Sequence, residues 1–204
     1  LKPVVKMGVS YNLLDLSSDN WLEMVKNSQC DAFLVWPSAY LSIWKELFDD
    51  RLAILVKQLG VTIYPSLEEI WLYENKRRVS YWLGAHQIPY PKTWVFYQKK
   101  DAMKFIEQLE YPIVYKTNTG ASASGVYFLE NKHKARKLIN KAFNKGIVAR
   151  RHNPNDRHWG VVLFQEYLEI KHEWRMVRIG DSFFGHPKGA REGLHSGSGI
   201  ALWD

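Results

Sequence analysis

Apolar runs and amphipathic stretches alternate along the early part of the chain. Short apolar runs at 4–10, 31–37 and 61–65 have the length and composition of buried strands. The segments between them, 19–28 and 39–58, are the expected helices. Strands that alternate with helices in this way imply a parallel sheet with helices on its faces. This part is therefore predicted to be an α/β lobe.

Two helix starts follow these elements. Ser66 is followed by Glu69, which is the pattern of a capping box at the first turn of a helix. Asn75 is the expected N-cap of a further helix over 76–85. The apolar residues expected to face inward in this second helix are Val79, Trp82 and Leu83.

After residue 92 the order of the elements becomes mixed, as is typical of an α+β lobe. A hairpin near its end is expected to turn at Gly180 and Asp181. The segment 148–160 is polar and basic and is expected to be a surface loop. The remaining expected elements are strands at 93–97, 112–117, 125–130 and 161–168 and helices at 100–110 and 131–145.

Composition limits the classes of function. The formal net charge of +7 suits a nucleic-acid partner, and it equally suits a nucleotide or acidic-metabolite pocket. Cys30 is the single cysteine, so the chain has no internal disulfide and fits a reducing, cytoplasmic compartment. No apolar run approaches the length that spans a membrane, and no membrane partner is expected.

A loop of small residues follows a lysine between two of the expected strands. It reads TNTGASASG over 117–125, directly after Lys116. Small residues let a backbone approach a ligand closely, and consecutive N–H groups in a loop bind anions. The loop matches neither a P-loop nor a GxGxxG pattern. It is either a flap over phosphates, with Lys116 as a point charge, or a long exposed turn beside a solvated lysine.

Four segments occur in an order and at a spacing that together resemble the ATP-grasp superfamily. The similarity covers about 65–199. It points in particular to the branch with glutathione synthetase, D-alanine–D-alanine ligase and the ligases that add glutamate to a ribosomal protein. The segments are YENKRRVSYWLGAHQIPYPKTW, YPIVYKTNTGASASGV, VLFQEYLE and HEWRMVRIGDSFFGHPKGAREGLHSGSG, which begin at Tyr73, Tyr111, Val162 and His172.

The resemblance implies a division into domains and a reaction. Residues 1–74 would form an N-terminal α/β domain. Residues 75–204 would form an ATP-grasp domain, with a flap lobe at about 93–165 and the start of a C-terminal lobe at 166–204. Such enzymes join a carboxylate to an amine or a thiol through an acyl-phosphate and release ADP and phosphate. The implied ligands are ATP, Mg²⁺ and an unidentified small-molecule carboxylate and amine, and a homo-oligomer is left open.

The resemblance also assigns nucleotide-binding roles to residues. Lys76 and Lys116 match lysines that bind the nucleotide phosphates, while Arg77 and Arg78 are taken as ordinary helix-surface residues. The implied closing loop contains Asn118, Thr119, Gly120, Ser122, Ser124 and Gly125, and the implied strand beside the adenine contains Gln165, Glu166, Tyr167 and Leu168.

In the hairpin region the family pattern implies a ribose contact and catalytic groups. Glu173 matches the acid that accepts hydrogen bonds from the ribose hydroxyls. Arg175 and Lys188 match catalytic basic groups near the transferred phosphate. Arg191 is the alternative to Lys188, because the register after the hairpin is open.

The family places its magnesium ligands late, as an acid on one strand and a Glu-x-Asn pair on the next. After Gly199 only IALWD remains, and Asp204 is its one acid. We therefore expect no metal ligand within residues 1–204, Mg²⁺ ligands beyond residue 204 and an incomplete C-terminal lobe, and we expect residues 1–204 alone to be inactive as a ligase. A relative without the metal site is the alternative.

Two other functions stay open. An ATP-grasp-like module could bind a nucleotide without ligating anything. A basic nucleic-acid-binding protein is the other reading, although the basic residues are spread along the chain and no known nucleic-acid-binding motif occurs. Nucleic acid is therefore the less favoured partner.

Overall fold

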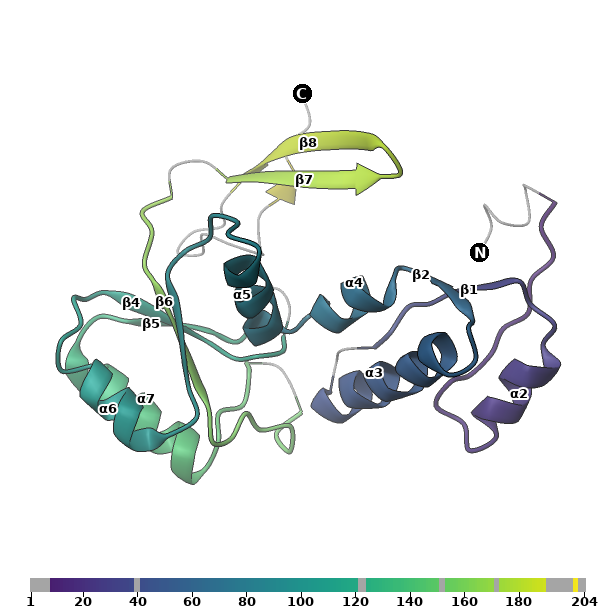
Figure 1. The fold of residues 1–204 in the computed structure, drawn as a ribbon. Coiled ribbons are helices and arrows are strands. Elements are labelled where there is room, and N and C mark those ends of the chain that lie inside the picture. Colours follow the sequence, from purple (N-terminus) through teal and green to yellow (C-terminus); the bar gives the residue numbers. More distant parts are fainter. Residues whose placement is uncertain are drawn as a thin grey trace. The chain divides into compact units, whose positions relative to one another are not determined.

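The computed structural model of the chain describes residues 8–38, 41–120, 124–150, 153–170, 173–189 and 200–201. Contacts within the chain divide it into two units, Leu1–Tyr73 and Glu74–Asp204. In the described residues the first unit contains one sheet and the second contains two, and each unit has its own hydrophobic core; both units are drawn in Figure 1.

The first unit is built around a parallel pair of strands. β1 (Ala32–Leu34) pairs with β2 (Thr62–Tyr64), and the chain between them forms α3 (Ser42–Lys57). α2 (Trp21–Asn27) precedes the pair and α4 (Leu67–Leu72) follows it. The α/β class with a parallel sheet is therefore confirmed for this part of the chain. The buried core residues of this unit are Leu16, Val25, Leu52, Leu55 and Ile70.

The strand expected at 4–10 is not formed in its described part. Residues 8–10 belong to no strand, and 4–7 lie outside the described residues. Gly8 has a φ of +71°, which a strand does not tolerate. The apolar composition of 4–10 therefore did not predict the structure of residues 8–10 correctly.

The capping box predicted at Ser66 and Glu69 is formed. The Ser66 hydroxyl accepts a hydrogen bond from the Glu69 N–H at 3.3 Å, and the Glu69 carboxylate accepts one from the Ser66 N–H at 2.8 Å. This confirms the capping box that starts α4.

Lys45 is buried in α3, where its amino group donates to the Asp49 carboxylate and, at 2.9 Å, to the Ile70 carbonyl. The side chain thus ties α3 to α4.

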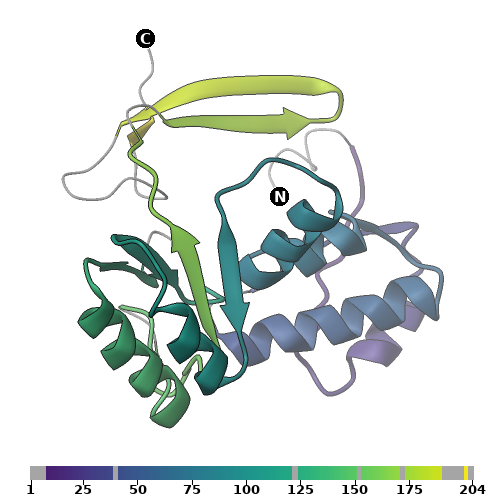
Figure 2. The same cartoon turned by 60° about the vertical axis from the view of Figure 1, so that its left-hand side comes forward.

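The second unit contains a four-stranded antiparallel sheet in the order β3-β6-β4-β5. α6 (Lys99–Phe105) and α7 (Lys132–Asn144) lie side by side against this sheet (Figure 2). Along β4, Ile113 and Tyr115 are buried in the core with both helices. Because side chains alternate along a strand, Lys116 points to the opposite face. The four strands are β3 (Thr93–Phe96), β4 (Ile113–Lys116), β5 (Val126–Leu129) and β6 (Val162–Glu166).

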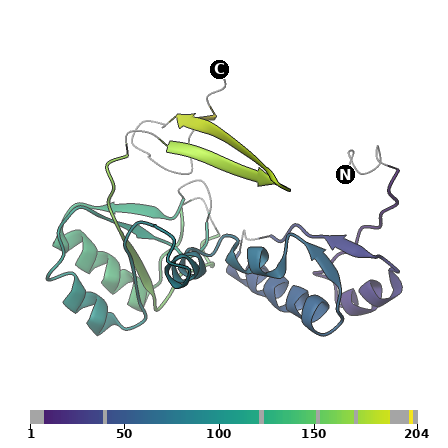
Figure 3. The same ribbon diagram turned by 45° about the horizontal axis from the view of Figure 1, so that its top comes forward.

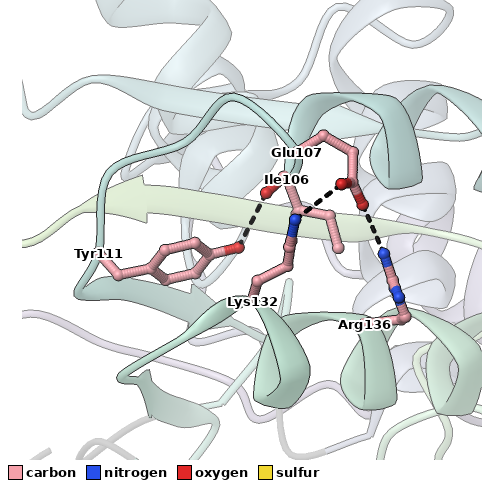
Figure 4. Close-up of polar contacts among 5 residues, drawn as sticks. All are labelled: Ile106, Glu107, Tyr111, Lys132 and Arg136. Atoms are coloured by element: carbon pink, nitrogen blue, oxygen red, sulfur yellow. Dashed lines mark hydrogen bonds and ion pairs between the residues drawn. The ribbon is translucent and has the colours of Figure 1, made fainter.

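A charged clamp joins α6 to α7 (Figure 4). The Glu107 carboxylate accepts hydrogen bonds from Lys132 at 2.8 Å and from Arg136 at 2.6 Å. These two bonds lower the pKa of Glu107 below its ordinary value. The Tyr111 hydroxyl donates to the Ile106 carbonyl at 3.2 Å. The clamp lies at the solvent surface, so it holds the helices in register without adding much stability.

α5 (Lys76–Ala85) begins where the sequence predicted. The Asn75 side chain accepts a hydrogen bond from the Arg78 N–H at 3.1 Å and caps the helix. The expected inward position of Val79 is wrong, because 37% of that residue is exposed, and Ser80 is buried in its place. The Ser80 hydroxyl can be buried because it donates to the Arg77 carbonyl at 2.8 Å.

A hairpin follows the sheet of the second unit (Figure 3). β7 (Glu173–Ile179) pairs in antiparallel fashion with β8 (Ser182–Gly189), and β8 also pairs with β9 (Ile200–Ala201). The turn at Gly180 and Asp181 is confirmed, and Gly180 has the positive φ, +57°, that such a turn requires. The predicted α+β character of this part is confirmed as well.

Candidate functional site

Two partly buried lysines lie at the base of the small-residue loop. The Lys116 amino group donates to the Gln165 side-chain oxygen at 2.5 Å. The Lys76 amino group, on the first residue of α5, donates to the Gly120 carbonyl at 2.7 Å. In the part of the chain that the structure describes, neither amino group forms an ion pair with a carboxylate.

The protonated forms of both lysines are disfavoured in the folded protein. Burial lowers the pKa of Lys116, and the positive charge of Lys76 lowers it further. Burial also lowers the pKa of Lys76, and the nearby carboxylate of Glu74 offsets part of this effect. Two cations held close together, neither with a direct ion pair in the described residues, form a site that an anion would stabilise.

A chain of hydrogen bonds orients Lys116. The Gln165 amide nitrogen donates to the Thr93 hydroxyl at 2.9 Å, and that hydroxyl donates to the Pro91 carbonyl at 2.8 Å. The amide oxygen of Gln165 is therefore directed at the lysine. β3, β6 and β4 are neighbours in the sheet, so the sheet order places these groups together.

The loop after Lys116 is closed at its base by one threonine. The Thr117 N–H donates to the Gly125 carbonyl at 2.8 Å, and the Thr117 hydroxyl donates to the Thr119 carbonyl at 2.7 Å. A Cβ on residue 125 would lie 1.6 Å from the Thr117 hydroxyl oxygen, so only glycine fits there. Gly120 has a φ of +116°, which also requires glycine.

The first turn of α5 is joined to this loop through Asn118. The Asn118 carbonyl accepts from the Lys76 N–H at 3.0 Å, and its side-chain oxygen accepts from the Arg77 N–H at 3.2 Å. Both N–H groups belong to a helix start, where no intrahelical partner exists. Among the loop residues implied by the resemblance, Ser122 lies outside the described residues. The Ser124 carbonyl accepts a hydrogen bond from the Arg150 N–H at 2.8 Å.

Arg77 is more than the ordinary surface residue that was expected. Its guanidinium donates to the Tyr97 hydroxyl at 2.9 Å and lies over the Tyr97 ring, 5.6 Å from the ring centroid. The Tyr81 hydroxyl lies 3.1 Å from that of Tyr97, and burial followed by this hydrogen bond raises the pKa of Tyr81 to about 12. Arg77 therefore helps to attach α5 to the segment that follows β3.

A cavity of about 930 Å³ opens beside strands β4, β5 and β6. Its wall combines apolar side chains with cations, and the only carboxylate among its described lining residues is Glu166. Five residues of the implied nucleotide site line this cavity, namely Lys116, Gln165, Glu166, Tyr167 and Leu168. The other lining residues are Pro91, Val114, Val126, Tyr127, Phe128, Leu129, Lys134, Lys137, Leu138, Lys141, Ile147, Arg150 and Ile170.

The strand expected to continue to residue 168 ends at Glu166. β3 begins at Thr93, and the β4 pairing ends with Ile113 opposite Glu166, so Tyr167 and Leu168 have no strand to pair with. Their placement in a strand was therefore wrong. The Glu166 carboxylate accepts from the Lys92 N–H at 2.7 Å, which fixes the strand end.

The hairpin brings together two residues that the resemblance gave to different roles. Glu173 and Lys188 face each other in the register and form an ion pair at 2.6 Å. Only 7% of the Lys188 side chain is exposed. Arg175 is exposed opposite His186, and Arg191 lies outside the described residues.

Two negative findings concern the described part of the chain alone. Within the residues placed by the structure, no three His, Cys, Asp or Glu side chains are grouped as a metal ion requires. None of the helices described there is long and apolar enough to cross a membrane.

Comparison with known proteins decides the family. A model of the RimK-like ATP-grasp domain matches residues 73–191, which is more than half of the chain. The chain belongs to the RimK-like ATP-grasp family. The resemblance inferred from the four sequence segments is therefore confirmed, and the family match spans the lysine pair, the loop and the cavity wall of this ATP-grasp domain.

Similar proteins include a ligase, a synthase and a further RimK domain protein. The alpha-aminoadipate–LysW ligase LysX of Saccharolobus solfataricus is 33% identical over 69 residues, which make up 34% of this chain and 25% of that ligase. A carboxyaminoimidazole ribonucleotide synthase from Aspergillus clavatus, solved with ATP, superimposes with a TM-score of 0.59 at 14% identity over 93% of this chain. A RimK domain ATP-grasp protein from Sphaerobacter thermophilus gives a TM-score of 0.51 at 19% identity over 74% of this chain.

The chain spans only part of the length of these proteins. It covers a quarter of LysX, 46% of the carboxyaminoimidazole ribonucleotide synthase and 53% of the Sphaerobacter protein. The structural matches are below 25% identity and establish the shared fold alone.

One residue of this ATP-grasp domain was missed by sequence reasoning. His158 lies in the segment expected to be a surface loop, but it is only 8% exposed, and its Nε2 lies 3.2 Å from the Thr119 hydroxyl. The expected surface loop is therefore wrong for this part of 148–160. The apolar residues Ile147 and Ala149, both buried, were the available signal.

Proposed function

We propose that the protein is an ATP-dependent ligase that joins a carboxylate to an amine through an acyl-phosphate. The observation that carries this proposal is the pair of Lys76 and Lys116. Both are partly buried, both have lowered pKa values, and both lie at the base of a loop whose glycines let its backbone approach a ligand. A triphosphate supplies the anionic charge that this pair lacks.

The residues of the cavity fit a nucleotide. Val114 and Val126 provide an apolar wall next to Lys116, as a purine ring requires, while the lysine can reach a phosphate. Gln165, Glu166, Tyr167 and Leu168 all line this cavity. The family pattern gives the segment 165–168 the role of bonding the edge of the base through its backbone, and the proposal assigns it that role.

The loop residues would bind phosphate mainly through their backbone. Asn118 and Thr119 use their carbonyls to hold α5 and Thr117, and among the described residues their N–H groups are the ones left to face an anion. Lys76 would exchange the Gly120 carbonyl for a phosphate oxygen. Phosphoryl transfer depends on such positioning and on positive charge more than on covalent chemistry by the protein.

In the reaction, the substrate carboxylate attacks the γ-phosphorus of ATP, the bond to the β–γ bridging oxygen breaks, and ADP leaves. The amine then attacks the acyl carbon, phosphate leaves with the bonding electrons, and the nitrogen gives up a proton to solvent. Arg175 and Lys188, with Arg191 as the alternative, would stabilise the charge on the transferred phosphate. The ion pair of Lys188 with Glu173 means that each would have to separate from the other before contacting a ligand. Mg²⁺, when bound to the phosphates, supplies further charge neutralisation.

The test is formation of ADP and phosphate that depends on an acid and an amine. The natural full-length protein is incubated with ATP and Mg²⁺ and with pairs drawn from a panel of amino acids, dicarboxylic acids and amines, and phosphate release is followed. We expect release for a subset of pairs, and we expect it to be lost in Lys116→Met. If ATP binds but no pair stimulates release, the chain acts as a nucleotide-binding module. If ATP does not bind, the proposal fails entirely.

A further inference from the structure

His158 is held in place by the backbone around it. The N–H and carbonyl of His158 pair with those of Ile147 at 2.8 and 3.0 Å. Gly146, just before this bridge, has a φ of +74°, and a Cβ there would lie 2.9 Å from the Cβ of Arg157. The backbone therefore fixes the imidazole in a buried position rather than leaving it on a surface loop.

The imidazole meets the small-residue loop at Thr119. The Thr119 hydroxyl lies 3.2 Å from His158 Nε2, and both residues are less than a tenth exposed. The carbonyl of Thr119 accepts the bond from the Thr117 hydroxyl. His158 thus holds the side chain of Thr119, and Thr117 holds its backbone carbonyl. Both Thr119 and His158 are buried.

The residues on each side of Thr119 contact α5. Asn118 accepts hydrogen bonds from the first turn of that helix, and the Gly120 carbonyl accepts from the Lys76 amino group. His158 therefore fixes the centre of a three-residue stretch whose other two members set the position of a proposed phosphate-binding lysine. These contacts join residues that are 39 and 44 positions apart in the sequence.

We propose that His158 is a positioning residue for nucleotide binding, acting through Thr119 on the loop and on Lys76. It does not touch the ligand. It holds the backbone of residues 118–120 in the conformation that receives the phosphates. This inference rests on the proposed function, since it requires the loop to bind the phosphates of ATP.

The first measurement is calorimetric titration of ATP with Mg²⁺ into His158→Ala and Thr119→Val, with His133→Ala as the matched control on the exposed start of α7. A lost hydrogen bond of this kind weakens binding by about three- to tenfold. We expect that loss in each of the two variants, no further loss in the double variant, and no change in the control. Thr119→Ser keeps the hydroxyl and should restore wild-type affinity.

A second ligand separates positioning from general damage to the fold. Adenosine lacks phosphates, so its affinity should be the same in wild type, His158→Ala and Thr119→Val. Equal losses for ATP and adenosine, multiplicative effects in the double variant or a Thr119→Ser variant as weak as Thr119→Val would overturn the inference. If His158→Ala does not fold, the comparison of Thr119→Val with Thr119→Ser tests the inference, because both variants leave His158 in place.

The two proposals fail in different ways. Wild-type protein that does not bind ATP removes the proposed function and this inference together. Wild-type protein that binds ATP, alongside His158→Ala and Thr119→Val variants with unchanged affinity, leaves the proposed function intact and removes only the role of His158.

Discussion

Replacement of Lys116 by methionine tests the charge at the centre of the candidate site. Methionine keeps most of the aliphatic length of lysine and removes the amino group that bonds Gln165 at 2.5 Å. A hydrogen bond to a charged group contributes about 1.5–3 kcal/mol. Loss of the lysine contact with a phosphate should therefore weaken ATP binding by about ten- to a hundredfold.

Stability should respond differently from affinity. The variant loses the bond from the charged amino group to Gln165, which contributes about 1.5 kcal/mol, the low end of the range for a hydrogen bond to a charged group. It also removes a partly buried charge whose protonated form is disfavoured by burial and by Lys76. These effects oppose each other, so the free energy of unfolding should change by less than about 1 kcal/mol. A binding loss without a stability loss is the signature of a lysine that is placed for a ligand.

The assay is calorimetric titration with ATP and Mg²⁺, together with urea denaturation of each variant. Lys104→Met is the matched control, because Lys104 is exposed on α6, a helix that packs against the opposite face of the sheet from Lys116. We expect the control to bind ATP as the wild type does. If both variants bind ATP within twofold of the wild type, the assignment of Lys116 to the phosphates is wrong.

Three further predictions concern the small-residue loop, the buried ion pair of α3 and the pH dependence of ATP binding. Gly125→Ala should lower the free energy of unfolding by about 2 kcal/mol or more in urea denaturation, because its Cβ would overlap the Thr117 hydroxyl; a change under about 0.5 kcal/mol would contradict the loop geometry. Asp49→Ala should cost about 3 kcal/mol in the same assay, because it leaves the buried Lys45 charge without its carboxylate, and an unchanged midpoint would refute this. The pKa values of Lys76 and Lys116 are lowered from 10.5, so ATP binding should take up protons as the pH rises through the lowered values, and affinity should fall there. Calorimetry of ATP binding in buffers of different ionisation enthalpy measures this proton uptake, and it would show none if the lysines are not the phosphate ligands. In the same pH window the unfolded chain binds more protons than the folded one, so the free energy of unfolding of the free protein should rise with pH.

The order of elements in the second unit was predictable because its signals are local. A capping residue acts within one helical turn, and a hairpin turn depends on neighbouring residues such as Gly180 and Asp181. Short strands separated by helices carry their own apolar pattern. The lysine that ends β4 and the small-residue loop after it were therefore placed from the sequence, and the family match covers both.

Element ends were less predictable, because they depend on partners that the local sequence does not contain. β6 ends at Glu166 since neither β3 nor β4 extends further alongside it. The segment around His158 has the composition of a polar surface loop. The His158 side chain is nevertheless buried, because the backbone of His158 pairs with that of Ile147.

What the sequence determined by itself was which short-range structures form and which residue types accompany them. The tertiary structure decided which side chains meet. Lys76 reaches Gly120, Lys116 reaches Gln165 and His158 reaches Thr119 across separations of 44, 49 and 39 residues. Lys116 meets Gln165 because β4 lies next to β6 in the order β3-β6-β4-β5, and a strand order depends on packing of the whole sheet against its helices rather than on any segment of the chain. The contacts of Lys76 and His158 likewise join segments that the local sequence does not connect.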